Sequence, residues 1–397
     1  MLSKNTTLTI IAKFLILLAN FALVVFTTRI WGSEGRGEIA LVLANISIIT
    51  IFSNIFCGSS IAFNASGVQR ETLLSLSFTG ALIITLAGAI VFAFIFGFGY
   101  FMPLFMIAFL LSLTNAVSSY WLGKNNIGKY NLITLLNPLF ILISLALLYF
   151  ILNRTSLNTI FNAYCIGLGL VVVTGITGLY LNEKFKKPEI NLAHFKNILS
   201  YGINNEFNYL IQFLNYRLSY YFIALLLGLS QLGVFSIVVA ISESVWIISR
   251  SMSAVHFSNV INSDDQLKNR KETVVFAKQS LIISLGLLAV AVAIPSSVYQ
   301  FIFGDEFGDI KKFILYMVPG ITATAVSNLY GHYFAGTGKL KILRDKALAG
   351  LAASLILLPL LTKKYQLTGV CISLNVSYLI SSVYLYLKFR KEQKNNP

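Results

Sequence analysis

The chain has 397 residues, of which 56% are hydrophobic and only 11% are charged. Soluble domains carry about 25% charged residues, so this composition excludes a soluble globular protein and predicts a polytopic membrane protein. The formal net charge is +15, but a nucleic-acid-binding protein would cluster its basic residues on one soluble face. Here they lie in short loops between apolar segments, so no nucleic-acid partner is expected.

Apolar segments long enough to cross a bilayer follow one another along the whole chain. A membrane-spanning helix needs about 20 mostly apolar residues, and the first segment is too long for the apolar core of a signal peptide. The sequence predicts an all-α fold with about twelve transmembrane helices. In chain order these are residues 9–30, 38–64, 73–99, 101–121, 132–152, 157–182, 200–227, 232–257, 274–302, 311–335, 346–362 and 367–388.

Successive loops alternate between many and few lysine and arginine residues. Short basic loops stay in the cytoplasm. With the N-terminus inside, the inner loops and tails hold twenty basic residues and the outer side holds seven. The pattern predicts that both termini are cytoplasmic and that the number of spans is even.

A basic segment at residues 183–199 separates two sets of six predicted helices. It also carries apolar residues such as Phe195 and Leu199, a mixture typical of an amphipathic helix on the inner membrane surface. An ordinary solvated loop is the alternative. The predicted organisation is an N-terminal bundle (1–182), this linker, and a C-terminal bundle (200–397).

Two short patterns recur in both halves. Residues 31–37 (WGSEGRG) return as residues 227–233 (LGLSQLG), with glycines five apart in each copy. The region 120–129, with Gly128-Lys129 at its end, resembles 332–339, which ends in Gly338-Lys339. Six helices per half give both copies the same orientation, so we expect two six-helix bundles related by a parallel pseudo-two-fold repeat.

Charged residues interrupt the seventh and eighth predicted helices. Glu206, Arg217, Glu243 and Arg250 all lie within residues 201–257. A charge at the centre of a bilayer costs about 2.5–3.5 kcal/mol, so such residues normally face a protein interior or a watery cavity. This stretch is a candidate transport site.

The seventh helix also presents a polar stripe. At about 100° per residue, seven amide, hydroxyl and phenol side chains fall on one face, which would suit a substrate rich in hydroxyl groups. They are Asn205, Asn208, Tyr209, Gln212, Tyr216, Ser219 and Tyr220.

A purely structural interpretation of the four charges stays open. If the two helices form an antiparallel hairpin with its turn near Leu229, Arg217 lies level with Glu243 and Glu206 lies roughly level with Arg250. Two buried ion pairs would then hold the hairpin together.

Other chemistry-bearing residues form no recognisable pattern. The cysteines have neither disulfide-framework nor metal-ligand spacing, the histidines are scattered, and no nucleophile–base pair or phosphate loop stands out. We therefore expect no metal, no cofactor and no enzymatic activity. The residues concerned are Cys57, Cys165, Cys371, His194, His256 and His332.

Short motifs spread over nearly the whole chain carry a family resemblance. They are Arg29-Ile30-Trp31-Gly32, Asn215-Tyr216-Arg217, Gly233-Val234-Phe235-Ser236, Phe303-Gly304-Asp305-Glu306-Phe307, Val318-Pro319-Gly320 and Gly336-Thr337-Gly338-Lys339. With them the chain resembles the polysaccharide-transporter branch, the O-antigen or lipid-linked oligosaccharide flippases, of the multidrug/oligosaccharidyl-lipid/polysaccharide exporter (MOP) superfamily.

The resemblance implies a bacterial cytoplasmic-membrane protein whose two bundles surround a cavity that opens alternately to each side. Its cargo would be an undecaprenyl-pyrophosphate-linked oligosaccharide. Membrane lipids, polysaccharide polymerases and chain-length proteins are the other partners it suggests. Guanidinium groups are suitable donors to a pyrophosphate, because they bind it bidentately. Glu206 and Glu243 could couple export to ions. The predicted substrate-binding residues are Asn205, Asn208, Tyr209, Gln212, Tyr216, Arg217, Tyr220 and Arg250.

Three other functions remain as alternatives. A cation-coupled multidrug exporter of the same superfamily would need an acid in the cavity without a basic partner, a role open to Glu206 or Glu243. A lipid II flippase usually has two further C-terminal helices. A membrane polymerase or ligase usually has a large outer loop, whereas the longest outer loop here, around 304–310, is short and acidic.

Overall fold

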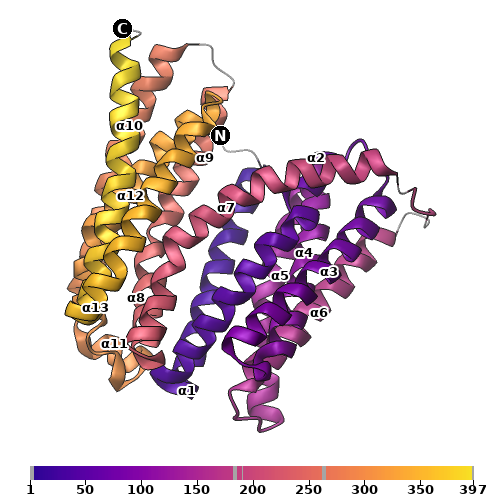
Figure 1. Ribbon diagram of the computed structural model, residues 1–397, viewed down its shortest axis with the longest axis horizontal. Helices are drawn as coiled ribbons and strands as arrows, with labels where there is room; N and C mark the ends of the chain where they lie inside the picture. Colours follow the sequence, from indigo (N-terminus) through magenta and orange to yellow (C-terminus); the bar gives the residue numbers. More distant parts are fainter. Residues whose placement is uncertain (1–3, 182–185, 190, 262–264, 396–397) are drawn as a thin grey trace. The chain divides into compact units, whose positions relative to one another are not determined.

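The computed structural model describes residues 4–181, 186–189, 191–261 and 265–395, and all regular elements within these ranges are helical (Figure 1). Nine of the described helices are long and apolar enough to cross a membrane. Two of the nine, α1 (Lys4–Cys57) and α13 (Leu340–Asn395), are double-length and bend at a non-helical residue. Together with the charged α7 (Leu192–Leu226) they account for twelve segments. The all-α, multi-pass prediction is confirmed.

The helices group into two compact units. Unit 1 comprises Met1–Ile30 and Val42–Leu210, and unit 2 comprises Trp31–Leu41 and Ile211–Pro397. Besides parts of α1 and α7, unit 1 contains α2 (Ser59–Asn64), α3 (Arg70–Phe96), α4 (Phe101–Gly123), α5 (Ile127–Ala146) and α6 (Asn158–Tyr180). Unit 2 contains α8 (Leu229–Ser244), α9 (Trp246–Ile261), α10 (Gln266–Ala293), α11 (Ser296–Phe303), α12 (Ile310–Gly336) and α13.

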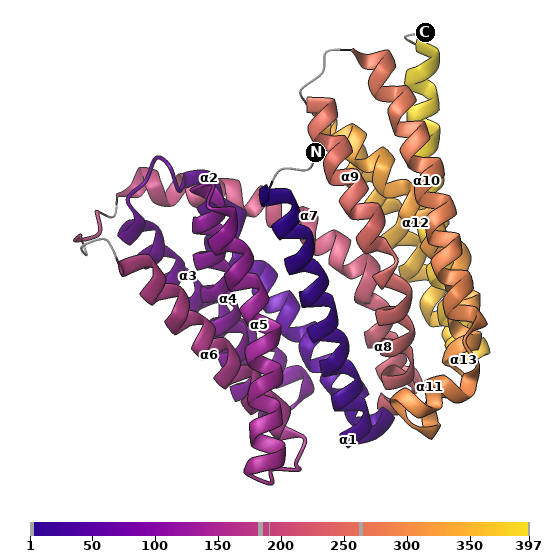
Figure 2. The same ribbon diagram turned by 180° about the vertical axis from the view of Figure 1, so that it is seen from behind.

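In each unit one helix packs against most of the others, and the two opposite views show the helices of each unit (Figures 1 and 2). In unit 1, α4 packs against α2, α3, α5 and α6. In unit 2, α12 packs in the same way against α8, α9, α10 and α13. Because lipid tails are as apolar as leucine, close packing rather than the hydrophobic effect holds such helices together.

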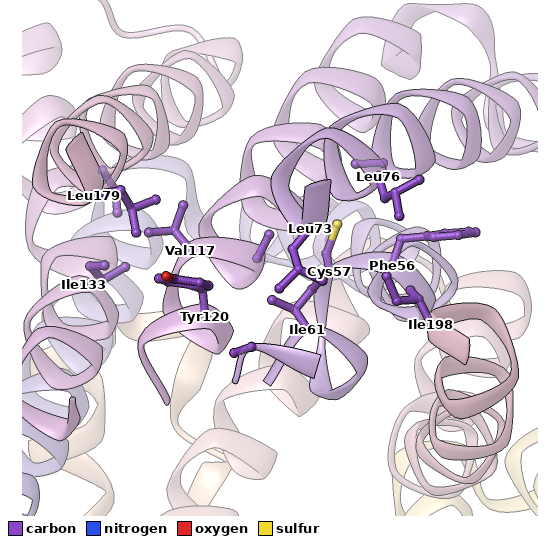
Figure 3. Packing of buried hydrophobic residues seen from close by; sticks show 14 residues of the cluster. Phe56, Cys57, Ile61, Leu73, Leu76, Val117, Tyr120, Ile133, Leu179 and Ile198 are labelled. Atoms are coloured by element: carbon purple, nitrogen blue, oxygen red, sulfur yellow. The ribbon is translucent and has the colours of Figure 1, made fainter. Parts of the chain in front are cut away.

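The core of unit 1 shows this close packing (Figure 3). Small residues let the backbones approach: a Cβ on Gly123 would overlap the carbonyl oxygen of Ala62, and one on Gly202 would overlap that of Ile55. Large apolar side chains fill the remaining space between the helices. Those labelled in the figure are Phe56, Cys57, Ile61, Leu73, Leu76, Val117, Tyr120, Ile133, Leu179 and Ile198.

Backbone conformation confirms the internal repeat. Eight described residues have a positive φ, a conformation that favours glycine and, less strongly, asparagine. They fall into four pairs, one member in each half of the chain, each at the same junction between helices. The pairs are Gly32 and Gly228, Gly97 and Gly304, Asn125 and Gly338, and Asn153 and Gln366.

The ends of α4 and α12 match in detail. After Gly123, the Asn125 amide donates to Leu122 O, and after Gly336, the Gly338 amide donates to Ala335 O. The repeat in the sequence therefore needs a small correction. Gly338 corresponds to Asn125 and not to Gly128, because the shared feature is the positive-φ residue that ends the helix.

The predicted linker lies partly outside the described residues, which omit 182–185 and 190. Its described part is tied to the start of α3: the Lys186 amide donates to Glu71 Oε1 at 3.2 Å, and the Glu189 amide donates to Thr72 Oγ1 at 2.9 Å. Helix α7 begins at Leu192, within the segment predicted to be amphipathic. The boundaries at 183 and 199 stay a prediction.

Gln366→Gly should stabilise the protein. Gln366 has φ 53° and ψ −137°, a region that only glycine adopts without strain, and such strain costs on the order of 1–3 kcal/mol. The added flexibility of the unfolded glycine chain would offset roughly 0.5–1 kcal/mol. We expect a higher melting temperature for the purified protein in detergent. Gln300→Gly, within helix α11, is the control and should lower it.

Candidate functional site

A bidentate ion pair lies inside unit 2. Arg217 of α7 donates through both terminal nitrogens to the two carboxylate oxygens of Glu243 on α8, each at 2.8 Å. Both side chains are largely buried, with 26% and 17% of their surfaces exposed. This is the first of the two ion pairs predicted for the hairpin, and it is confirmed.

Aromatic side chains flank this pair. The Arg217 guanidinium lies 5.3 Å from the ring centre of Tyr220. Tyr216 lies one helical turn before Tyr220. Its ring packs against those of Trp246 and Tyr378, at centroid distances of 5.1 and 5.9 Å. The Trp246 indole donates to the Ile321 carbonyl at 2.9 Å, which fixes the ring. Trp246 and Tyr378 are buried, with 0% and 4% of their surfaces exposed, so they support Tyr216, which keeps part of its surface exposed.

Beyond the aromatic cluster lies a basic group. The Arg250 guanidinium is 5.6 Å from the ring of Trp246, is exposed, and makes no ion pair with the described residues. Arg250 and Lys346 are the basic groups that act electrostatically on the ring of His332. His332 in turn is held by the Asn328 carbonyl at 2.9 Å. Arg250, His332 and Lys346 thus gather from α9, α12 and α13.

A second polar site lies inside unit 1. Glu206 is only 5% exposed, and its Oε1 accepts from the Asn205 side-chain amide at 3.2 Å. The same Asn205 amide donates to Ser59 Oγ at 2.5 Å, and Gly58 leaves room for the carboxylate beside it. The predicted pairing of Glu206 with Arg250 is therefore not what the structure shows: neutral donors surround Glu206.

The polar stripe predicted on α7 divides between the two units. Unit 2 contains Gln212, Tyr216, Arg217 and Tyr220. The residues up to Leu210 pack in unit 1. There Asn205 contacts Ser59, while Asn208 and Tyr209 are exposed.

Four residues of the unit 2 site were missed in the sequence. Trp246 and Tyr378 looked like ordinary apolar residues, and their approach to Tyr216 depends on helix packing. Lys346 marks the start of a predicted span, so it was counted as a loop charge. His332 is one of three scattered histidines in the sequence. Only their positions on neighbouring helix faces, which the fold determines, bring them together.

Comparison with known proteins places this geometry in context. No family model matches the chain. A curated relative, the capsular polysaccharide biosynthesis protein CapF of Staphylococcus aureus, is 21% identical over 401 aligned positions, covering 98% of this chain and 99% of the relative.

Two solved structures share the architecture over almost their full lengths. One is the inward-facing conformation of a multidrug resistance MATE family transporter of the MOP superfamily, with TM-score 0.78, 14% identity, and 96% of each chain covered. The other is the lipid II flippase MurJ in an inward closed conformation, with TM-score 0.75, 16% identity, and 97% of this chain and 87% of that chain covered. The chain thus has the all-helical fold of these MOP-superfamily transporters, and its sequence resembles that of a capsular polysaccharide biosynthesis protein, in agreement with the predicted resemblance.

Proposed function

We propose that this protein is a flippase that moves an undecaprenyl-pyrophosphate-linked oligosaccharide across the bacterial cytoplasmic membrane by alternating access. The observation that carries the proposal is the charge balance inside unit 2. The site contains three basic side chains and one acidic side chain. The basic ones are Arg217, Arg250 and Lys346, and the acidic one is Glu243. A cargo with an anionic headgroup would restore neutrality there.

The division of labour among these cations follows from their partners. Glu243 occupies both terminal nitrogens of Arg217, so Arg217 with Glu243 forms a neutral, donor-rich wall. Arg250 and Lys346 make no ion pair with any described residue, and they offer the uncompensated charge. A guanidinium can bind two phosphate oxygens bidentately, and the partly exposed ring of Tyr216 suits contact with a sugar or an isoprenoid chain.

A cation-coupled drug exporter is the second candidate function, and Glu206 favours it. This acid is buried among neutral groups, without a cation among its described hydrogen-bonding partners. Under the flippase proposal the same carboxylate, with Glu243, would couple cargo movement to an ion. The S. aureus relative, named for capsular polysaccharide biosynthesis, supports the polysaccharide cargo.

The protein would lie in the cytoplasmic membrane with both termini inside, divided into functional halves at residues 183–199. Surrounding lipids and polysaccharide polymerase or chain-length proteins would be its partners, and it would perform no covalent chemistry. The basic inner loops support this orientation.

The test in cells is deletion of the gene and complementation with the wild-type protein. Loss of surface polysaccharide, with the lipid-linked precursor accumulating inside, is the expected result. Unchanged polysaccharide together with increased sensitivity to cationic drugs would support the exporter instead.

Arg250→Gln should reduce surface polysaccharide at normal protein abundance. The side chain is exposed within unit 2 and its removal breaks no ion pair, so folding should be little affected while the cargo loses a charged partner. Arg344→Gln is the matched control, because Arg344 is 47% exposed and pairs only at 3.6 Å with its neighbour Asp345. Surface polysaccharide equal in the two variants would contradict the role of Arg250.

A further inference from the structure

A short piece of α1 packs apart from its flanks. Residues Trp31–Leu41 group with unit 2, although the chain on both sides, up to Ile30 and from Val42, groups with unit 1. The second residue of the piece, Gly32, has a φ of 63° that interrupts the helix. The chain therefore crosses between the units at both ends of this piece, which we call the strap, and again between Leu210 and Ile211 of α7.

Several polar contacts fasten the strap to unit 2, and one of them is the donation of Arg36 Nε to Ser236 Oγ on α8 at 3.2 Å. Glu306, in the short turn before α12, accepts the Ser33 amide at 2.7 Å through Oε2. Ser33 Oγ lies 2.6 Å from Ser230 Oγ at the start of α8. The carboxylate thus caps the first turn of the resumed helix, where unpaired amides and the helix dipole favour an anion.

The glycines beneath these contacts interlock without side chains. The amide nitrogen of Gly233 lies 3.0 Å from the position that a Cβ on Gly37 would take. Likewise, the amide nitrogen of Gly37 lies 3.0 Å from the position that a Cβ on Gly233 would take. This reciprocal contact joins the two copies of the repeat. At this point of contact no side chains would have to disengage for the strap to part from α8.

The internal repeat shows that the turn does not need Glu306. The turn Asp305–Phe307 follows Gly304, just as Phe98–Tyr100 follows Gly97 in the first half, and both glycines have positive φ. Glu306 corresponds to Gly99, which would have open space around a Cβ. One copy of the turn forms without an acid, so the acid in the other copy serves its contact with Ser33.

We propose that Glu306, Ser33 and Ser230 form a releasable latch, and that the strap must leave α8 during each transport cycle. The latch holds one state of the transporter while the cargo site is loaded, and parting it permits the other state. Only this link to the cycle rests on the proposed transport function; the fastening itself does not.

A reversible cross-link tests the link to the cycle. In a variant with the native cysteines replaced (Cys57→Ala, Cys165→Ala, Cys371→Ala), Ser33→Cys and Ser230→Cys should form a disulfide on mild oxidation. Transport of lipid-linked oligosaccharide in liposomes should stop on oxidation and return on reduction. Full transport by the cross-linked protein would overturn the proposal, because the strap would then be a static part of unit 2.

A control cross-link and the activity before oxidation interpret that result. Asn54→Cys with Asn115→Cys joins residues that hydrogen-bond within unit 1 at 3.1 Å, and this cross-link should leave transport intact. Absence of transport even before oxidation would count against the proposed function and not against the latch.

A second readout needs no cargo. Ser33 is 3% exposed, so Ser33→Cys should react slowly with a membrane-impermeant maleimide. Glu306→Gln should raise that labelling rate several-fold, because the amide of residue 33 loses its charged partner. Asp305→Asn, an exposed neighbour in the same turn, should not change it. Equal rates with and without Glu306→Gln would overturn the latch whatever the cargo is.

Discussion

Replacing Gly233 with leucine should remove the protein from the membrane. A Cβ at this position would overlap the carbonyl oxygen of Ser33 and approach the Gly37 amide to 3.0 Å. The obstacle is backbone on the facing helix, which no rotamer change relieves, so the cost should exceed about 3 kcal/mol. Membrane abundance, measured with an epitope tag, should fall to a small fraction of the wild-type level.

Gly286→Leu is the matched control for this change. Gly286 lies in α10 and nothing comes within 4 Å of its Cβ position, so a leucine there should reach normal abundance. If Gly233→Leu were as abundant as Gly286→Leu, the close contact between the two repeat copies would be wrong.

Arg217→Ala should abolish transport and also destabilise unit 2. The change leaves the Glu243 carboxylate, 17% exposed, without its partner, and breaking a buried pair costs about 3–5 kcal/mol. Residual exposure places this site near the lower end of that range. The measurements are the melting temperature of the purified protein and surface polysaccharide in complemented cells.

The double variant Arg217→Met with Glu243→Leu separates the two effects. Removing both charges leaves no unpaired group, so the melting temperature should recover much of the loss. Transport should stay lost, because the donor-rich wall is gone. Recovery of transport along with stability would mean that the pair serves the fold alone.

Much of the fold could be predicted from the sequence because apolar length and loop charge are local properties. The twelve spans needed only a count of apolar residues, and the Gly32 and Gly228 motifs revealed the repeat. The pairing of Arg217 with Glu243 was also predictable, because a tight hairpin turn at Gly228 fixes the register of the helices that follow.

The second predicted pair shows where such reasoning ends. Helix α8 ends at Ser244 and α9 begins at Trp246, so the hairpin register does not continue to Arg250. The N-terminal part of α7 packs against α1 and α2. There the Asn205 side-chain amide donates to Ser59 Oγ, and Gly58 leaves room for the Glu206 carboxylate. These contacts join residues about 150 positions apart in the chain. No local sequence pattern predicts them.

The most direct test of the proposed function is flipping by the purified protein. Liposomes would carry undecaprenyl-pyrophosphate-linked oligosaccharide in both leaflets, and an added glycosidase would cleave only what is exposed outside. With the wild-type protein we expect cleavage of nearly all the oligosaccharide, whereas Arg250→Gln and empty liposomes should leave the inner half protected. Protection of that half with active wild-type protein, shown to be folded by its melting curve, would contradict the account.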